Sequence, residues 1–154
     1  AMLFELFDQL RRRLAKAYRL EIDPRGAIEA TEESDVKDIQ YFAEQYGGVI
    51  HAVPAVFVEI GKLDLAQRVK GRWGMSVGIT LHVVTEVASE SDYGTPDLAL
   101  RRHEELALRA TDALEGEVVE FKGGRSRPLR ATGWSFYARY QGWMVSLIDL
   151  ETKV

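Results

Sequence analysis

The chain has 154 residues, the length of one domain with a full hydrophobic core. Its net charge of −4 gives no electrostatic basis for nucleic-acid binding, and the absence of cysteine excludes disulfides and thiolate metal sites. No apolar run approaches the roughly 20 residues that a membrane-spanning helix requires.

The first segment, "MLFELFDQLRRRLAKAYRL", predicts an amphipathic helix. Its cations crowd the second half, where they suit the helix dipole. A surface helix packed by one stripe is favoured over a basic membrane-surface helix, because Phe4 is the only apolar residue well off the stripe. The stripe is Leu3, Leu6, Phe7, Leu10, Leu14, Ala17 and Tyr18.

Residues 21–46 are acidic, with eight acids against two bases. We expect residues 21–50 to form a long acidic loop or arm, with a short helix from Asp35 to a Gly47 cap. Such a segment is either disordered or folds against a partner. Its aromatic residues argue against disorder, because aromatic rings favour burial; they are Tyr41, Phe42 and Tyr46.

The stretch "HAVPAVFVEIG" predicts a strand that starts after Pro54, because proline cannot donate a ladder hydrogen bond. Both faces of this strand are largely apolar, so we expect it to be covered on both sides. Glu59 is the exception. It either reaches solvent at the strand end beside Gly61 or acts as a catalytic acid, and the solvent reading is favoured.

The stretch "WGMSVGITLHVVTE" alternates with period two, which is typical of a strand buried on one side. One face holds Trp73 and every second residue to Val83. The other face holds small and polar residues from Gly74 to His82, and its glycines leave room for another chain element.

A second helix is predicted from Thr95 as cap and Pro96 as first residue to a stop at Gly116. His103 lies among acids in "RRHEE", which indicates a solvated face. A short strand at "EVVEFK" and a basic turn follow; the turn, residues 122–130, holds four cations and no acid.

The C-terminal stretch predicts a hairpin around Gln141–Gly142. A two-residue loop pairs Tyr140 with Trp143, Ala138 with Val145 and Phe136 with Leu147, and it makes Phe136 a buried residue. The complete pattern predicts one α+β domain: a mostly antiparallel sheet of about four strands with helices packed on one face.

Catalytic motifs are sparse. The stretch "GMSVG", residues 74–78, has no helix start near it, no cysteine is available as a nucleophile, and the three histidines, His51, His82 and His103, lack metal-ligand spacing. We therefore predict no catalytic residue, no cofactor and no metal site.

The order of these elements, with "HAVPAVFVEIG", "WGMSVGITLHVV", the helix after "YGTPD" and the aromatic hairpin, resembles the tail-terminator or tail-completion proteins of long-tailed phages and prophages. The resemblance implies a homo-oligomeric ring, commonly a hexamer, that caps the tail tube and joins it to the head. It implies tail-tube and head-completion proteins as partners, host cytoplasm during assembly and the virion tail afterwards as locations, and no membrane or sequence-specific nucleic acid as partner.

Opposite charges suggest how a ring would close. Residues 62–72 hold four cations against one acid, so two basic loops complement the acidic segment, either within one chain or between subunits. The predicted interface comprises Tyr41, Phe42, Tyr46, Lys70, Arg72, Arg125 and Arg127. The alternative function is a small enzyme or ligand-binding domain, with a pocket over the glycine face of residues 74–78 and Glu59 or His82 inside it.

Overall fold

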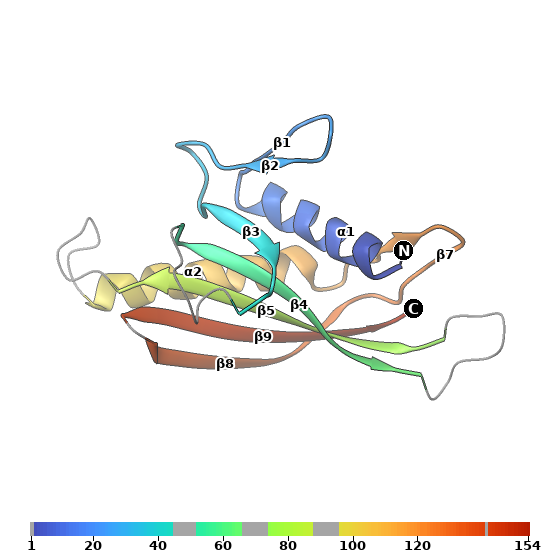
Figure 1. Cartoon of the computed structure of the whole chain (residues 1–154). Coiled ribbons are helices and arrows are strands. Elements are labelled where there is room, and N and C mark those ends of the chain that lie inside the picture. The colour runs from blue at the N-terminus through green and yellow to red at the C-terminus, as the bar shows by residue number, and fades with distance from the viewer. Residues whose placement is uncertain (1, 45–51, 66–73, 88–95, 141) are drawn as a thin grey trace.

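Two helices, α1 (Met2–Ala17) and α2 (Pro96–Leu114), pack on one face of a five-stranded sheet (Figure 1). The computed structural model describes residues 2–44, 52–65, 74–87, 96–140 and 142–154. The sheet contains β3 (Asp38–Tyr41), β4 (Ala55–Asp64), β5 (Ser76–Glu86), β8 (Arg130–Tyr140) and β9 (Trp143–Lys153). Two small hairpins are made by β1 (Glu21–Ile22) with β2 (Ile28–Glu29) and by β6 (Glu120–Phe121) with β7 (Gly124–Arg125).

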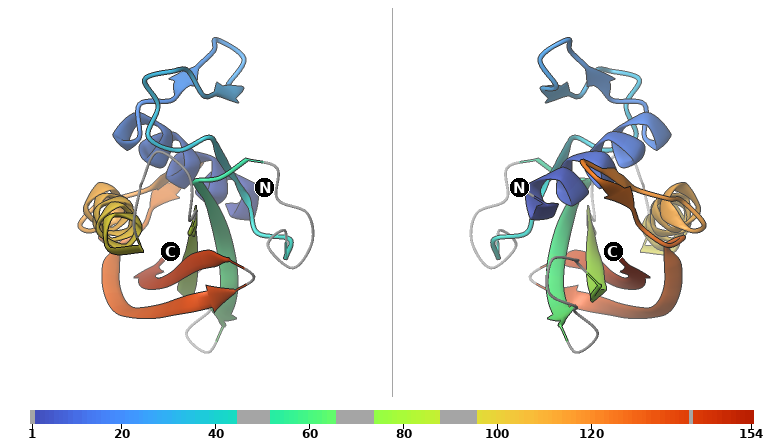
Figure 2. Two further views of the ribbon diagram at one scale, coloured as in Figure 1. Left: turned by 90° about the vertical axis from the view of Figure 1, so that its left-hand side faces the viewer. Right: turned by 90° about the vertical axis from the view of Figure 1, so that its right-hand side faces the viewer.

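The strand order is β3-β4-β5-β9-β8, and every neighbouring pair except β3-β4 is antiparallel. The predicted α+β class with a mostly antiparallel sheet is therefore confirmed. Figure 2 shows the twisted sheet curling around the two helices, which share its concave face. Twist of this kind follows from the right-handed preference of each strand.

The fifth strand, β3, corrects the expectation of a short helix from Asp35. Ile39 is buried between Asp38 and Gln40, which is the period of a strand. The backbone of β3 pairs in parallel with the first half of β4, from Asp38 opposite Ala55 to Tyr41 opposite Val58. The backbone hydrogen bonds that make β3 a strand come from β4, which lies later in the chain. The spacing of residues within the segment after Asp35 therefore does not reveal them.

The larger core lies between the helices and the sheet. Its residues repeat with the predicted periods of about 3.6 in the helices and two in β5. Members that are at most 1% exposed include Leu6, Leu10 and Leu14 of α1, Leu106, Ala110 and Leu114 of α2, and Val77, Ile79, Leu81 and Val83 of β5.

A smaller core covers the opposite face of the sheet, where Ala55 and Phe57 of β4 pack with Val84 and Val145. Val56 and Val58 of β4 belong to the larger core, so the first half of β4 is buried on both faces as predicted, whereas its end is exposed. Phe42, which follows β3, and Val53, which precedes β4, pack against this smaller cluster.

The predicted boundaries of the second helix agree with the structure. Pro96 is its first residue, where a missing N–H costs nothing, and Thr95 lies outside the described residues. Gly116 follows the last turn with a φ of 81° and donates its N–H to the Leu129 carbonyl at 2.8 Å. A left-handed φ at this place is the usual reason for a glycine after a helix.

The C-terminal hairpin forms, but the predicted register holds only beside the turn. Tyr140 pairs with Trp143 as expected, whereas Val145 lies opposite Tyr137 and Phe136 lies opposite Ser146. Residues 138 and 139 lie opposite a single residue of β9, which makes a β-bulge. Relative to the predicted register, the bulge moves the side chains of the residues before it, including Phe136, to the other face of the sheet. Phe136 is therefore 42% exposed, and the prediction of its burial was wrong.

These burial values predict different costs for two truncations in the hairpin. Ile148→Ala should lower the free energy of unfolding by about 2–5 kcal/mol, because Ile148 is 1% exposed in the larger core. Phe136→Ala should cost less than about 2 kcal/mol, because much of its ring already contacts water. Urea denaturation of both variants measures the difference, and equal costs would contradict the bulged register.

Candidate functional site

The predicted interface residues fall in separate places. Tyr41 and Phe42 lie at the end of β3, while Arg125 ends β7 and Arg127 follows it. The three others, Tyr46, Lys70 and Arg72, lie outside the described residues. The aromatic residues Tyr41 and Phe42 and the basic residues Arg125 and Arg127 therefore belong to different parts of the fold.

An aromatic patch, defined by Phe4, Phe7 and Tyr41, joins the start of α1 to β3. The Phe7 ring lies edge-on to both others, with centroid distances of 6.3 Å to Phe4 and 5.5 Å to Tyr41. Phe7 is buried, but Phe4 is 62% and Tyr41 is 42% exposed. The Tyr41 hydroxyl contacts the backbone of Ile60, accepting from its N–H at 3.2 Å. Tyr41 is thus held in place while much of its ring stays accessible, which suits an anchor for a partner protein.

Phe42 has a different environment from Tyr41. Its ring stacks on the His82 imidazole, with centroids 3.9 Å apart and an interplanar angle of 5°. The Phe42 N–H donates to the Val58 carbonyl at 2.8 Å, which continues the β3-β4 pairing by one residue. Phe42 therefore covers the second face of the sheet in its own chain.

Beneath Phe42, Glu59 and His82 meet on the second face of the sheet. The Glu59 Oε1 lies 2.8 Å from His82 Nε2. β4 continues to Asp64, so Glu59 lies inside the strand and not at its end. Burial lowers the pKa of His82, and the Glu59 carboxylate opposes part of that shift. His82 is 3% exposed under an aromatic ring, so its imidazole is poorly placed to meet a substrate.

His103 is buried, so the expectation of a solvated position was wrong. It is 1% exposed where α2 crosses the sheet. Its Nδ1 lies 2.7 Å from Thr85 Oγ1 and its Nε2 lies 2.6 Å from Ser146 Oγ, which also accepts from Trp134 Nε1 at 2.8 Å. Both partners are on strands far from His103 in sequence, so the "RRHEE" stretch gives no sign of them.

A serine hydrogen-bonded to a histidine that a third group orients has the layout of an activated nucleophile. Here Ser146 is 0% exposed and Thr85 is 4% exposed. Burial also lowers the pKa of His103 to about 4, which makes it a weak base at neutral pH. The arrangement therefore satisfies buried polar groups and fixes α2 on the sheet, and it does not present a nucleophile.

The acidic segment is fastened to α2 and to the turn after α1 through Asp35, which is 7% exposed. Its carboxylate lies 2.8 Å from Arg19 Nη2 and 2.6 Å from Arg109 Nη1 of α2. Burial raises the pKa of Asp35, but the hydrogen bonds and charges of the two arginines outweigh burial and hold it below its usual value. One of the eight acids is thus neutralised within the chain, and the segment after it is anchored.

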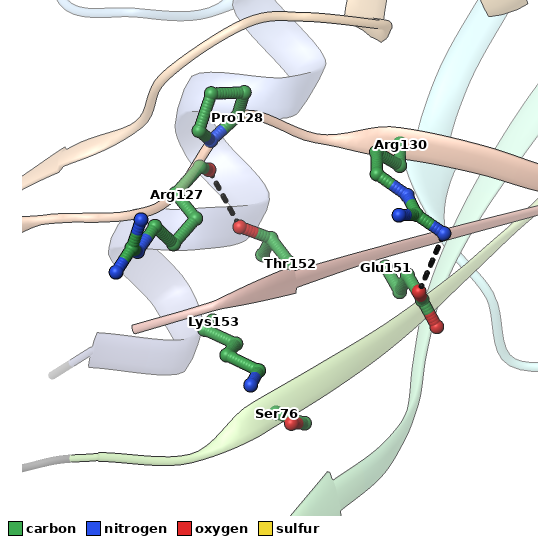
Figure 3. Close-up of a pocket in the computed structure, with 7 residues that line it drawn as sticks. All are labelled: Ser76, Arg127, Pro128, Arg130, Glu151, Thr152 and Lys153. Atoms are coloured by element: carbon green, nitrogen blue, oxygen red, sulfur yellow. Dashed lines mark hydrogen bonds and ion pairs between the residues drawn. The ribbon is translucent and has the colours of Figure 1, made fainter.

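A basic pocket lies where β5 begins and β9 ends, with a volume of about 450 Å³. Figure 3 shows Arg127 at one end, Arg130 at the other, and Lys153 reaching toward Ser76. Arg130 pairs with Glu151 at 3.4 Å, with both side chains more than half exposed, so the pair is weak. The pocket thus has the chemistry of a site for carboxylates or other anions; its lining is Ser76, Arg127, Pro128, Arg130, Glu151, Thr152 and Lys153.

The backbone of Arg127 is held firmly beside this pocket. Its N–H donates to the Lys153 carbonyl at 2.8 Å, and its carbonyl accepts from Thr152 Oγ1 at 2.6 Å and from Ser126 Oγ at 2.8 Å. These hydrogen bonds attach the predicted basic turn to the end of β9, so the backbone that carries the Arg127 side chain is held in place.

The described residues contain no group of three or more His, Asp or Glu side chains that could hold a metal ion. Within the same part of the chain, no helix is both long and apolar enough to cross a membrane.

No protein-family model matches the sequence, and no curated protein matches it. Among solved structures, the fold is similar to that of a chain in the virion of a native gene transfer agent (GTA) particle. The superposition has a TM-score of 0.51 and covers 75% of this chain and 77% of that chain, at 16% sequence identity. At this identity the likeness establishes a shared fold.

The buried histidines predict how stability depends on pH. The unfolded chain binds a proton at His103 near its usual pKa of 6.5, whereas the folded chain does so only near 4, so stability is lost as the pH falls between these values. The loss at His103 amounts to about 3 kcal/mol at most, and His82 acts in the same direction. Asp35 has a lowered pKa, so its contribution disappears only at more acidic pH, below its usual 3.8.

Urea denaturation at a series of pH values from 8 to 4 measures this loss. His103→Gln should be less stable at pH 8 but should show a smaller decrease toward pH 4, and His82→Gln provides the comparison for the second histidine. An unchanged pH dependence in His103→Gln would show that His103 is not the titrating group.

Proposed function

We propose that this chain is a structural protein of a phage-like particle. The observation that carries the proposal is the fold shared with a chain of a gene transfer agent virion over about three quarters of both chains. Within that class we propose a tail terminator: a homo-oligomeric ring, with a hexamer as the expected form, that caps the tail tube and joins it to the head. Its partners are then other copies of itself and the tail-tube and head-completion proteins. It assembles in the host cytoplasm and remains in the virion tail.

The surroundings of the polar side chains support an assembly role over catalysis. His82 and Glu59 pair with each other beneath Phe42, and His103 and Ser146 are buried in one hydrogen-bond network. The basic pocket includes Ser76, but Glu59 and His82 are not in its lining. The two features that the enzyme alternative needed together, a pocket over residues 74–78 and a titratable pair inside it, therefore lie apart.

In this proposal the subunit interface is head-to-tail, so that two different surfaces meet. Tyr41 of the aromatic patch supplies an apolar anchor, and Phe42 holds the end of β3 in place by stacking on His82. Arg125 and Arg127 supply the basic side, with Tyr46, Lys70 and Arg72 as further proposed contacts. Charged groups around an aromatic anchor steer association and fix its register.

Light scattering tests the interface. Tyr41→Ala should shift the protein toward smaller species at a given concentration, because it removes an exposed anchor from the aromatic patch. Tyr137→Ala is the matched control, since Tyr137 is 54% exposed on β8, away from the patch. Equal masses for the wild type and both variants at every concentration would contradict a role for Tyr41.

Electron microscopy tests the place of the protein in the particle. Gold-labelled protein added to tail tubes should mark one end of each tube, the end that meets the head, because a terminator ring stops tube growth there. Label distributed along the tube walls, or no label on tubes, would contradict the terminator assignment. Genes for portal, tail-tube and tape-measure proteins beside the gene of this chain would support it.

A further inference from the structure

The β1–β2 hairpin and the loop after it form an acidic projection. Residues 21–33 hold five acids and one base, and all five acids are exposed. Glu21 lies directly opposite Glu29 in the register of the two strands. Like charges at opposed positions repel each other, so this pair is unfavourable unless a cation approaches it. A cation from a basic partner would therefore reduce the repulsion between Glu21 and Glu29.

The projection is fixed in shape before any partner arrives. Asp23 accepts hydrogen bonds from the Arg25 and Ala27 N–H groups at 2.7 and 2.9 Å, which holds the turn. At its base, Ser34 Oγ donates to the Arg19 carbonyl at 2.7 Å and Asp35 is clamped by two arginines. A preformed hairpin loses little conformational entropy on docking. Glu21, Glu29 and Glu32 remain as its outward charges.

The basic pocket is the complementary surface. Arg127 and Lys153 are exposed there, and the backbone of Arg127 is fixed by its three hydrogen bonds. Arg130 contributes a third cation, held only by the weak pair with Glu151. A rigid basic pocket of about 450 Å³ can receive the carboxylates of a narrow hairpin.

The two surfaces do not meet within one chain. None of the ion pairs among the described residues joins residues 21–33 to the pocket. Helix α1 lies between the hairpin and the C-terminal end of β9 in the views of Figures 1 and 2. The acidic hairpin and the basic pocket can therefore meet only when they belong to two different molecules.

We propose that the β1–β2 hairpin of one copy docks in the basic pocket of the next copy. This inference rests on the proposed ring and names the charged contact that closes it. The hairpin and the pocket are different surfaces of the same chain, so the contact is heterologous and generates a ring when the rotation closes. Relief of the repulsion between Glu21 and Glu29 by Arg127 or Lys153 favours this contact over solvated, separate charges.

A charge exchange between two variants tests the docking. The hairpin variant is Glu29→Lys with Glu32→Lys, and the pocket variant is Arg127→Glu with Lys153→Glu. The control, Glu104→Lys with Asp112→Lys, changes the net charge as the hairpin variant does but on exposed positions of α2. Circular dichroism confirms folding of each variant; if a reversal prevents folding, the neutral Gln substitutions at the same positions replace it.

Sedimentation velocity at about 0.05 M salt measures self-association, with a second series at about 1 M, where the Debye length is only about 3 Å. Each reversal alone should weaken association at least about 100-fold, because like charges then face each other. In the equimolar mixture of the two variants, the association constant should recover to within about tenfold of the wild-type value, because every hairpin can again bind a pocket of opposite charge. The control should associate as the wild type does, and high salt should weaken all complexes.

Three results would overturn the docking: reversed variants that associate like the wild type, a mixture that does not recover, or a wild type that stays monomeric throughout. The first two leave the ring itself intact if Tyr41→Ala still reduces the mass and the label still marks the tube end. Loss of the tube-end label would instead refute the terminator assignment.

Discussion

The alternation of residues along β5 determines which face of the sheet becomes the core. Its residues from Val77 to Val83 at every second position are almost completely buried in the larger core between the helices and the sheet, where α2 packs against β5 and α1 packs against β3 and β4. The intervening positions face the other side of the sheet, where small and polar residues remain. A one-residue slip would exchange these two sets, so the register of the central strands is strongly specified.

The second face of the sheet divides into two regions. At one end, Phe57, Val84 and Val145 form the smaller core under Phe42. Toward the other end, Thr80 donates to Asp149 at 2.8 Å, and Lys153 lies opposite Ser76 beside the pocket. The apolar region stabilises the fold, while the polar region remains open to solvent and supplies the pocket.

His103 and Asp35 are buried polar side chains that are used for structure. The imidazole of His103 joins α2 to two strands, and Asp35 joins the acidic segment to α2 and to the turn that follows α1. Buried polar groups are costly unless satisfied, so these networks fix geometry more than they offer chemistry.

Features that depend on local periodicity could be predicted from the amino-acid sequence alone. The stripes of α1, the start of α2 at Pro96, the two-sided burial of the first half of β4 and the alternation of β5 all follow from neighbouring residues within one segment. The tight turn beside Gly142 is another such feature, because turn geometry is set by a few adjacent residues.

Which segments meet, and in which register, depends on contacts that form only in the folded protein. β3 became a strand because the free edge of β4 accepts it, and Phe136 became exposed because a bulge in β8 shifts the register after residues 138 and 139. His103 is buried because Thr85 and Ser146, on two other strands, satisfy both ring nitrogens. The β3–β4 pairing and the hydrogen bonds of His103 join separate segments of the chain, and periodicity within one segment contains no information about such partners.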